Sequence, residues 1–370
     1  MCYNIRVKKM NIACLCAFGL EGVVRHELHT LGYSETQTEN GRVNLEGDFS
    51  DVARLNFCLR AADRVVLPLG KFPASTFDEL YEGARRAEFP FPKNARIMVS
   101  GKSVKSKLSA FEVCASVTKK ALIDRACASL GVTSLSGEEE YRLTVSLRED
   151  VAELYLDTTG KGLSFRGYRR LNGPAAIRET LAAALVILSH WSPDKPFFDP
   201  FCGTGTLPIE AALYANAVPP NLSSTFDFEK WRACDADVPA LRRALREKIL
   251  SRPLEIFGSD IDENALSMSR YHAKQAGVKV DFRVADIRKC SRKFPGGTLV
   301  TNPPYGERIS DRQEARELLA ALSAYSKSAG IRSLNVITPE RDFERIAGEK
   351  CRKRKLYNGG IECVFFQRWD

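Results

Sequence analysis

The sequence has few of the residues from which metal sites and disulfide frameworks are built. Its four histidines are dispersed, and its 11 cysteines are an odd set with scattered spacing. Cys14 and Cys16 form a C-x-C pair, but no second pair or nearby histidine completes a zinc-binding set. Disulfide frameworks occur in short secreted chains with regular cysteine spacing. We therefore predict reduced thiols, no metal site and a cytoplasmic location.

Long apolar runs are missing as well. No stretch approaches the roughly 20 apolar residues that a bilayer-spanning helix needs, so we expect no membrane association. The first 22 residues superficially resemble a signal peptide, but their apolar run continues into an amphipathic helix pattern without a clear cleavage region. The content of 44% hydrophobic and 27% charged residues is typical of globular proteins. A chain of 370 residues can form two or three domains.

The charge balance is basic. There are 55 Lys and Arg residues against 46 Asp and Glu residues, a formal net charge of +9. Such an excess suits a polyanionic partner, because cationic side chains that neutralise phosphates release condensed counterions. An ordinary basic protein has the same balance, so charge alone leaves both interpretations open.

Hydrophobic periodicity changes along the chain and predicts an α+β front part followed by an α/β part. In the front part we expect strands at 11–20, 41–47, 63–72 and 95–108, helices at 20–31, 49–62, 77–87 and 110–130, and a strand pair at 141–160. From residue 175 onward we expect helices at 175–190, 205–216, 262–276, 312–328 and 340–347, and strands at 196–201, 254–260, 278–286, 296–302 and 333–339, with a terminal hairpin at 355–369. This alternation predicts a doubly wound, mostly parallel sheet, with a domain break near 160–170.

A glycine-rich turn, "DPFCGTG", follows the first strand of the α/β part. Gly203 and Gly205 allow a ligand to approach the backbone closely, and the next helix presents free N–H groups. A tight strand-to-helix turn without a ligand is the alternative, which the position at the first strand disfavours. The G-K-[ST] ending of a phosphate-binding loop is absent.

Two acidic positions follow the next two strands, where open α/β sheets bind ligands. In "GSDID", Asp260 is placed to accept the hydroxyls of a ribose, while Asp262 is assigned to cap the following helix. Residues 218–250 form an insertion that separates this motif from the glycines. In "VAD", Asp286 is placed to accept from an adenine amino group, although a simple loop aspartate would look the same.

The fourth motif, "TNPPYGER", ends the strand at 297–301, because proline cannot donate to a sheet ladder. The rigid prolines would hold the side-chain oxygen of Asn302 and the carbonyl of Pro303 toward the cleft. Two acceptors at one spot suit an exocyclic amine with two N–H donors. Tyr305 would offer a flat face on which an extruded base stacks. A proline-stiffened loop is the alternative.

These motifs in this order resemble the class I S-adenosylmethionine-dependent methyltransferases that modify exocyclic amines of nucleobases. With "RETLAAALVILSHW", "FDFEKW", "KRKLYNGGIECVFFQ" and the segment at 99–122, the chain resembles the THUMP-containing RNA guanine methyltransferases, closest to the bacterial large-subunit ribosomal RNA (guanine-2-amino) branch. The resemblance implies a Rossmann-like methyltransferase domain at 163–370, preceded by a ferredoxin-like unit at 1–60 and a THUMP RNA-binding domain at 61–162. It covers nearly the whole chain.

The resemblance also implies the residues of the site. Catalysis would fall to Asn302, Pro303, Pro304 and Tyr305. S-adenosylmethionine, which leaves as S-adenosylhomocysteine, would contact Thr180, Asp199, Pro200, Cys202, Gly203, Thr204, Gly205, Asp260, Ile261, Asp286, Ile287 and Asn302. RNA would contact a basic cluster of Lys102, Lys105, Lys107, Lys119 and Lys120, for which a solvated surface is the alternative.

Several other functions stay open at this point. A tRNA guanine methyltransferase has the same architecture, and an RNA-binding or ribosome-assembly protein with a decayed site is the alternative from a different class. A DNA adenine methyltransferase would carry a separate DNA-reading domain, and a protein glutamine methyltransferase would not need a basic front domain. A hydride-transferring enzyme fits least, because the spacing of the ribose carboxylate is wrong. The oligomeric state is unknown, with a monomer or a weak dimer as the alternatives.

Overall fold

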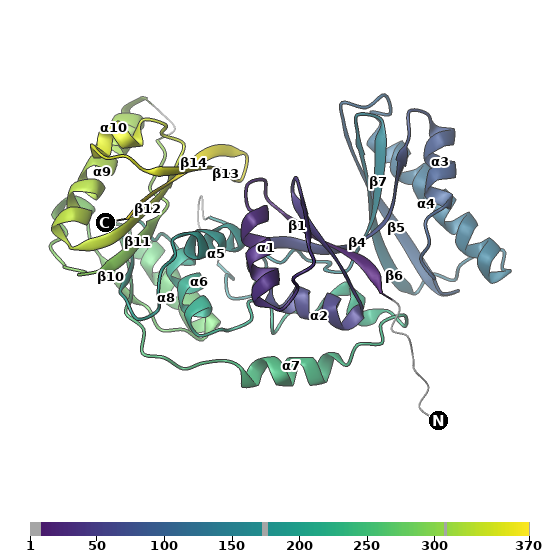
Figure 1. The fold of residues 1–370 in the computed structure, drawn as a ribbon, viewed down its shortest axis with the longest axis horizontal. Coiled ribbons are helices and arrows are strands. Elements are labelled where there is room, and N and C mark those ends of the chain that lie inside the picture. The colour runs from purple at the N-terminus through teal and green to yellow at the C-terminus, as the bar shows by residue number, and fades with distance from the viewer. Residues whose placement is uncertain (1–8, 172–176, 307–308, 370) are drawn as a thin grey trace.

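Two seven-stranded sheets form the framework of an elongated molecule (Figure 1). The computed structural model describes residues 9–171, 177–306 and 309–369. The first sheet belongs to the front part of the chain and the second to the α/β part.

The first sheet has the strand order β2-β3-β1-β4-β7-β6-β5. Its β5–β6 pair is parallel, and its other pairs are antiparallel. Its strands are β1 (Met10–Cys16), β2 (Gln37–Glu39), β3 (Arg42–Gly47), β4 (Ala62–Pro73), β5 (Ala95–Val104), β6 (Glu139–Arg148) and β7 (Val151–Asp157). Its helices are α1 (Glu21–Thr30), α2 (Phe49–Cys58), α3 (Phe77–Arg85) and α4 (Phe111–Leu130).

The second sheet has the order β10-β9-β8-β11-β12-β14-β13. The five strands from β10 to β12 are parallel, and β14 pairs antiparallel with both β12 and β13. Its strands are β8 (Phe197–Asp199), β9 (Ile256–Asp260), β10 (Asp281–Val284), β11 (Gly297–Thr301), β12 (Ile331–Thr338), β13 (Arg352–Asn358) and β14 (Ile361–Trp369). Its helices are α5 (Glu179–Leu188), α6 (Thr206–Ala215), α7 (Val238–Glu247), α8 (Glu263–Ala276), α9 (Ile309–Ser328) and α10 (Phe343–Ala347), with short 3₁₀ turns η1 (Asp227–Lys230) and η2 (Ile287–Lys289). The predicted doubly wound, mostly parallel sheet with an antiparallel edge hairpin is confirmed.

The sequence patterns locate most elements to within a few residues. The expected helix at 49–62 ends at Cys58, because the chain turns there into the long strand β4. The expected helix at 340–347 begins only at Phe343, after a turn in which the Thr338 hydroxyl accepts from the backbone of Glu340. The short strand β2 was not expected. The first two residues of the helix predicted at 175–190 lie outside the described residues, and α5 begins at Glu179.

The predicted boundary between residues 60 and 61 falls within one continuous sheet. Strand β4 follows it directly and pairs with β1 on one side and with β7 on the other. The two front units therefore share a sheet, and their division stays a prediction. Helix α4 packs against β5, and α3 packs against α4 and β4, far from the second sheet in Figure 1.

Buried hydrogen bonds of arginine side chains join the front part to the α/β part. The guanidinium of Arg60, which follows α2, donates to the carbonyl oxygens of Leu213 and Val218 at the end of α6. The side chain of Glu27 accepts from the backbone N–H of Arg60 at 2.8 Å. Nearby, Arg166 and Glu210 form an ion pair of 3.6 Å whose side chains are 1% and 0% exposed. This ion pair lies within the α/β part, where the buried charges need each other. Arg166 also donates to the carbonyl oxygen of Arg60, so the contacts of Arg60 in both directions join the two parts.

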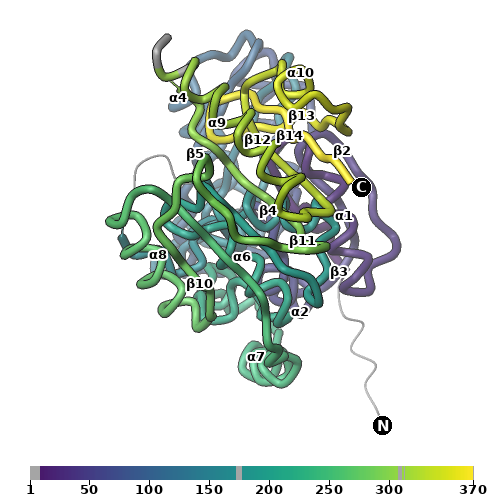
Figure 2. Tube along the Cα trace, turned by 90° about the vertical axis from the view of Figure 1, so that its left-hand side faces the viewer, coloured from purple at the N-terminus to yellow at the C-terminus, as the bar shows by residue number. Residues whose placement is uncertain are grey.

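The terminal hairpin also contacts the front part. Arg354 in β13 donates to the carbonyl oxygen of Gly19, at 3.3 Å, in the loop between β1 and α1. In the same place the rings of Phe18 and Tyr357 meet edge to face, 6.4 Å apart. Helix α7, by contrast, lies at the edge of the molecule beside α2, as Figures 1 and 2 show. Within the described residues no helix has both the length and the apolar composition of a bilayer span.

Candidate cofactor and acceptor site

The strand order of the second sheet reverses at β8, which has β9 on one side and β11 on the other. Such a switch point opens a crevice at the carboxyl ends of parallel strands, where α/β proteins bind ligands. Asp199 ends β8 and Asp260 ends β9, while Asn302 directly follows β11. The expected motifs are therefore brought together at one edge of the sheet.

The glycine turn between β8 and α6 needs both of its glycines for different reasons. Gly203 has φ +50° and Gly205 has φ +83°, in the left-handed region that side chains disfavour. A Cβ atom on Gly205 would lie 2.9 Å from the ring of Phe282 and 3.0 Å from Ser269 Cβ. A Cβ atom on Gly203 would meet nothing within 4 Å. Gly205 thus serves close packing, while Gly203 faces open space.

Three side chains outside the turn hold its backbone in place. Asp260 Oδ2 accepts from the N–H of Gly203 at 2.9 Å. The Ser269 hydroxyl donates to the carbonyl oxygen of Gly203 at 2.6 Å, and His272 Nδ1 lies 3.2 Å from that of Thr204. Ser269 and His272 are three positions apart on α8, so one helix face clamps the turn. Asp262 caps α8 through the N–H of Asn264, as predicted.

His272 is a neutral structural residue. A carbonyl oxygen only accepts, so Nδ1 carries the hydrogen that goes to Thr204, and Nε2 accepts from the backbone N–H of Leu171 at 3.4 Å. Burial lowers the pKa of His272 below its ordinary value. The roles of His272 and Ser269 could not be predicted from the sequence, because their partners are far away in the chain.

Asp199 lies beneath the glycine turn, 1% exposed. Its Oδ1 accepts from the Thr301 hydroxyl at 2.6 Å and from the N–H of Phe201 at 3.1 Å. Burial raises the pKa of Asp199 to about 7, although these hydrogen bonds oppose the shift. The carboxyl group therefore titrates near neutral pH, where a nearby cation would favour its ionised form. It also ties the end of β8 to the end of β11.

The other residues expected near the methionine end of the cofactor are buried. Cys202 packs in a cluster with Phe282, and burial raises its thiol pKa well above the ordinary value. Pro200 is buried and Thr204 is 6% exposed, and no described residue hydrogen bonds to the Thr204 hydroxyl. The hydroxyl of Thr180 donates to Asp63 at 2.9 Å, so it is already engaged by the front part.

On the side where the ribose and adenine are expected, the apolar residue Ile261 is exposed between the carboxylates of Asp260 and Asp262. Ile261 directly follows Asp260 and is 70% exposed, whereas Ile287 is buried. Asp286 caps the beginning of η2 and forms an ion pair of 2.7 Å with Arg288. The hydrogen bonds from Arg288 lower the pKa of Asp286. An adenine amine would share this carboxylate with Arg288.

The residues present fit S-adenosylmethionine. Open space lies over Gly203, the buried hydroxyl of Thr204 has no described partner, and Ile261 exposes an aliphatic surface suited to a flat ring. Asp260 would hold the ribose, although its oxygens already accept from the N–H groups of Gly203 and Asp262. Carboxylate oxygens accept more than one hydrogen bond each, so these contacts leave room for hydroxyl donors.

The acceptor motif has an internal hydrogen bond. Asn302 and Tyr305 are half-buried, Pro303 is buried and Pro304 is exposed. The Tyr305 hydroxyl donates to Asn302 Oδ1 at 2.5 Å, and it accepts from Asn358 Nδ2 at 2.9 Å. No described residue donates to the carbonyl oxygen of Pro303. The motif's Glu307 and Arg308 lie outside the described residues.

The five expected RNA-contacting lysines are all exposed, but they do not form one face. Lys102 belongs to the outward row of β5, because the alternate residues of this strand, such as Ile97, join the core with Leu122 of α4. Lys119 and Lys120 lie on α4, which covers the other face of the sheet. Lys105, with φ +51°, and Lys107 lie in the loop that connects the two.

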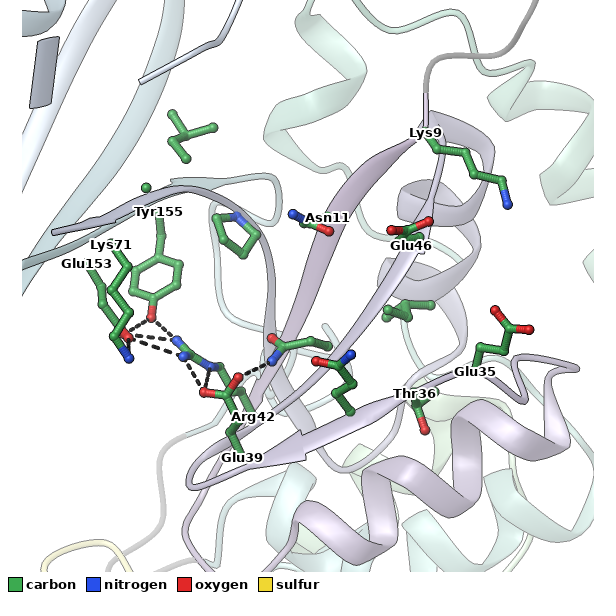
Figure 3. A pocket seen from close by; sticks show the side chains of 16 residues that line it. Lys9, Asn11, Glu35, Thr36, Glu39, Arg42, Glu46, Lys71, Glu153 and Tyr155 are labelled. Carbon is green, nitrogen blue, oxygen red and sulfur yellow. Dashed lines mark hydrogen bonds and ion pairs between the residues drawn. The ribbon is translucent and has the colours of Figure 1, made fainter. Parts of the chain in front are cut away.

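A cavity of about 780 Å³ lies elsewhere, on the first sheet (Figure 3). Three cationic side chains and four carboxylates line it, among them Lys71 and Glu153, which pair at 3.0 Å. Arg42 in its floor contacts Glu39, Glu153 and the hydroxyl of Tyr155. Arg42 and Lys71 are thus paired with carboxylates, and a lining of four carboxylates against three cations does not favour a phosphate. Among the described residues, no group of three or more His, Cys, Asp and Glu side chains is placed to hold a metal ion.

Comparison with known proteins agrees with this geometry. Residues 166–367, more than half of the chain, match the family described as "RMKL-like, methyltransferase domain", and residues 11–66 match the "RlmL ferredoxin-like domain". The chain is 37% identical over 374 residues to "Putative RNA methyltransferase YpsC" of Bacillus subtilis strain 168, covering 98% of this chain and 97% of that protein.

Two solved structures are similar over nearly the full length. One is described as a predicted N6-adenine-specific DNA methylase from Listeria monocytogenes, with 37% identity, a TM-score of 0.91, and coverage of 98% of this chain and 96% of that one. The other, SMU.472, is a putative methyltransferase in complex with SAH, with 35% identity, a TM-score of 0.92 and 98% coverage of both chains. That complex agrees with the expected cofactor. The chain therefore belongs to the RMKL-like methyltransferase family.

Proposed function

We propose that the protein methylates the exocyclic 2-amino group of a guanine in large-subunit ribosomal RNA, with S-adenosylmethionine as the donor. The observation that carries this proposal is the meeting of the glycine turn, Asp260 and Asn302 at one switch point. The B. subtilis relative is named an RNA methyltransferase, which supports RNA over DNA as the substrate. The description of the Listeria protein as a DNA adenine methylase makes adenine the base to test against guanine.

The chain's own groups explain how an amine is made ready for transfer. S-adenosylmethionine supplies a methyl group that its sulfonium already activates. Asn302 Oδ1 and the Pro303 carbonyl would accept the two N–H groups of the amine and hold its nitrogen in line with that methyl group. Positioning of reacting atoms about 3–3.5 Å apart supplies much of the acceleration. These hydrogen bonds also return electron density to the nitrogen, and the surplus proton passes to water.

We further propose that β4–β7 with α3 and α4 serve as the THUMP RNA-binding domain. Lys102 on the outward row of β5 is joined by Arg96 on the same strand and by Arg148 on β6. None of the three forms an ion pair with a described residue. Free cations on an open sheet face suit RNA, whose helices are contacted mainly through backbone and shape.

The substrate is tested with S-adenosylmethionine that carries a deuterated methyl group. The protein is incubated separately with unmodified large-subunit ribosomal RNA and with unmodified tRNA. Each RNA is then digested, and the masses of its nucleosides are measured by mass spectrometry. Labelled 2-methylguanosine from ribosomal RNA alone is the expected result. Label on tRNA keeps the chemistry and changes the RNA, while labelled N6-methyladenosine changes the base. Absence of label on both RNAs, with the cofactor bound, favours an RNA-binding or ribosome-assembly protein.

The RNA-binding face is tested by the salt dependence of affinity. Lys102→Ala combined with Arg148→Ala removes two outward cations of the sheet, and Lys119→Ala combined with Lys120→Ala removes two cations of α4. Each lost phosphate contact lowers the slope of log affinity against log salt by about 0.7–0.9. We expect the reduction in the sheet variant; a reduction only in the helix variant would move the RNA to the other face.

A further inference from the structure

We propose that Asn358 and Tyr305 are positioning residues that orient the amide of Asn302 for methyl transfer. This inference rests on the proposed function and assigns a role to the terminal hairpin. Tyr305 was expected only as a flat surface for the base, and Asn358 had no assigned role. The three side chains come from two places, the end of β11 and the end of β13.

The direction of the two hydrogen bonds follows from their chemistry. An amide NH₂ group only donates, so Asn358 Nδ2 donates to the Tyr305 hydroxyl, 2.9 Å away. A phenol has a single hydrogen, which then goes to Asn302 Oδ1 at 2.5 Å. The thiol of Cys363 lies 3.6 Å from the same hydroxyl and adds a second donor. All donors therefore point from the hairpin toward Asn302.

This direction selects one orientation of the Asn302 amide. The terminal torsion of asparagine is broad and roughly two-fold, so oxygen and nitrogen can exchange places at little cost. A donor at Tyr305 is compatible only with the oxygen and rejects the NH₂ group. The oxygen keeps a second lone pair for the substrate amine. Without the donor, the NH₂ group would face the amine in part of the molecules and repel its hydrogens.

The surroundings keep this relay intact, that is, the hydrogen bonds that run from Asn358 through Tyr305 to Asn302. Burial raises the pKa of Tyr305 above its ordinary value, so the phenol retains its hydrogen at neutral pH. The hairpin that holds Asn358 is itself fixed to the front part, through Arg354 and the carbonyl oxygen of Gly19. A side chain on Gly19 would collide with the carbonyl oxygen of Lys355 at 2.7 Å. Close backbone packing thus sets the position of the hairpin.

Three substitutions separate this role from simple stacking. Tyr305→Phe keeps the ring and removes the hydroxyl, and Asn358→Ala removes its donor. Asn358→Asp places an acceptor there, which draws the phenol hydrogen away from Asn302. We expect kcat to fall about tenfold in each, the size of one lost orienting hydrogen bond, with the KM for S-adenosylmethionine unchanged. The double variant Tyr305→Phe with Asn358→Ala should be no worse than Tyr305→Phe, because both act through one hydroxyl.

The control is Tyr33→Phe, which removes a tyrosine hydrogen bond to Asp51 on the front part. It should retain the wild-type kcat. Wild-type kcat in Tyr305→Phe would overturn the proposal and leave only the ring with a role. Additive losses in the double variant would also overturn it, because the two residues would then act separately.

A second measurement needs no RNA, so it separates this inference from the proposed function. With ¹⁵N-labelled asparagine, the side-chain NH₂ signals of Asn302 are assigned by their disappearance in Asn302→Ala. They should shift in both Tyr305→Phe and Asn358→Ala, and stay in place in Tyr33→Phe. If the wild-type protein transfers no labelled methyl group to RNA, the proposed function fails. The shifts of the Asn302 signals still test whether Tyr305 and Asn358 orient the Asn302 amide. Unchanged Asn302 signals in Asn358→Ala would overturn it.

Discussion

The same substitution should affect the two glycines of the glycine turn differently, with the larger loss of stability at Gly205 and the larger loss of cofactor affinity at Gly203. Gly205→Ala places a left-handed residue at φ +83°, which costs about 1–2 kcal/mol. Its Cβ would also press against Phe282 and Ser269 at 2.9 and 3.0 Å, and such overpacking adds about 1–3 kcal/mol. We therefore expect the free energy of unfolding to fall by about 2–5 kcal/mol. Gly203→Ala should lose only the first part, about 1–2 kcal/mol, because its Cβ would meet nothing within 4 Å.

Cofactor affinity should show the reverse order. The open space over Gly203 is where the cofactor would lie, so its Cβ should weaken S-adenosylmethionine binding at least about tenfold, or 1.4 kcal/mol. Urea unfolding gives the stability of both variants, and calorimetric titration at a temperature where both are folded gives the affinity. If Gly203→Ala binds the cofactor as wild type does, the space over Gly203 is not the cofactor site.

Other residues give further predictions. The pKa of Asp199 is raised to about 7, and the positive charge of bound S-adenosylmethionine would favour the ionised carboxylate. Cofactor affinity should therefore rise as pH increases toward 7 and level off above it. A flat affinity profile from calorimetry between pH 5.5 and 8.5 would place Asp199 outside the site. Arg166→Ala leaves the buried carboxylate of Glu210 without its ion-pair partner and should lower the free energy of unfolding by about 3–5 kcal/mol. The double variant Arg166→Ala with Glu210→Gln should recover part of this loss, as measured by urea unfolding. His272→Ala removes one anchor of the glycine turn and should lower stability by about 1–3 kcal/mol, which a thermal melt with and without cofactor would measure.

Local signals in the sequence were sufficient to locate most of the elements and the ends of the strands that carry the motifs. Asp262 was predicted as a cap because it precedes a helical pattern, and it accepts from Asn264 as expected. The prolines after Thr301 predicted the end of a strand, and β11 stops there. In both cases the physical cause lies within a few residues of its effect.

Contacts between distant positions were not predictable in this way. Asp199 and Thr301 are 102 positions apart, and their hydrogen bond depends on β8 and β11 becoming neighbours. The bond from Asn358 to Tyr305 spans 53 positions and requires the hairpin to fold back over the acceptor loop. No local pattern contains such pairings, so the sequence could indicate the motif residues but not what orients them.

For the predicted lysine cluster, the sequence contains a strand period that helps to divide the five lysines. The burial of residues 95–104 alternates between an inward and an outward row, and the polar outward residues Arg96, Ser100 and Lys102 follow this period in the sequence, although the outward Met98 and Val104 are apolar. That period already separates Lys102 from the lysines of α4. Proximity in sequence suggested one patch, whereas the strand period gives two.

The most direct test of the central claim compares Asn302→Ala with Asn44→Ala, an asparagine on the first sheet, remote from the crevice. Deuterated methyl transfer to RNA and the Kd for S-adenosylmethionine are measured for both variants and for wild type. If the end of β11 holds the acceptor amine, Asn302→Ala loses far more transfer activity than cofactor affinity, because Asn302 is expected to contact the cofactor as well, while Asn44→Ala retains both. Transfer at the wild-type rate in Asn302→Ala would contradict the account.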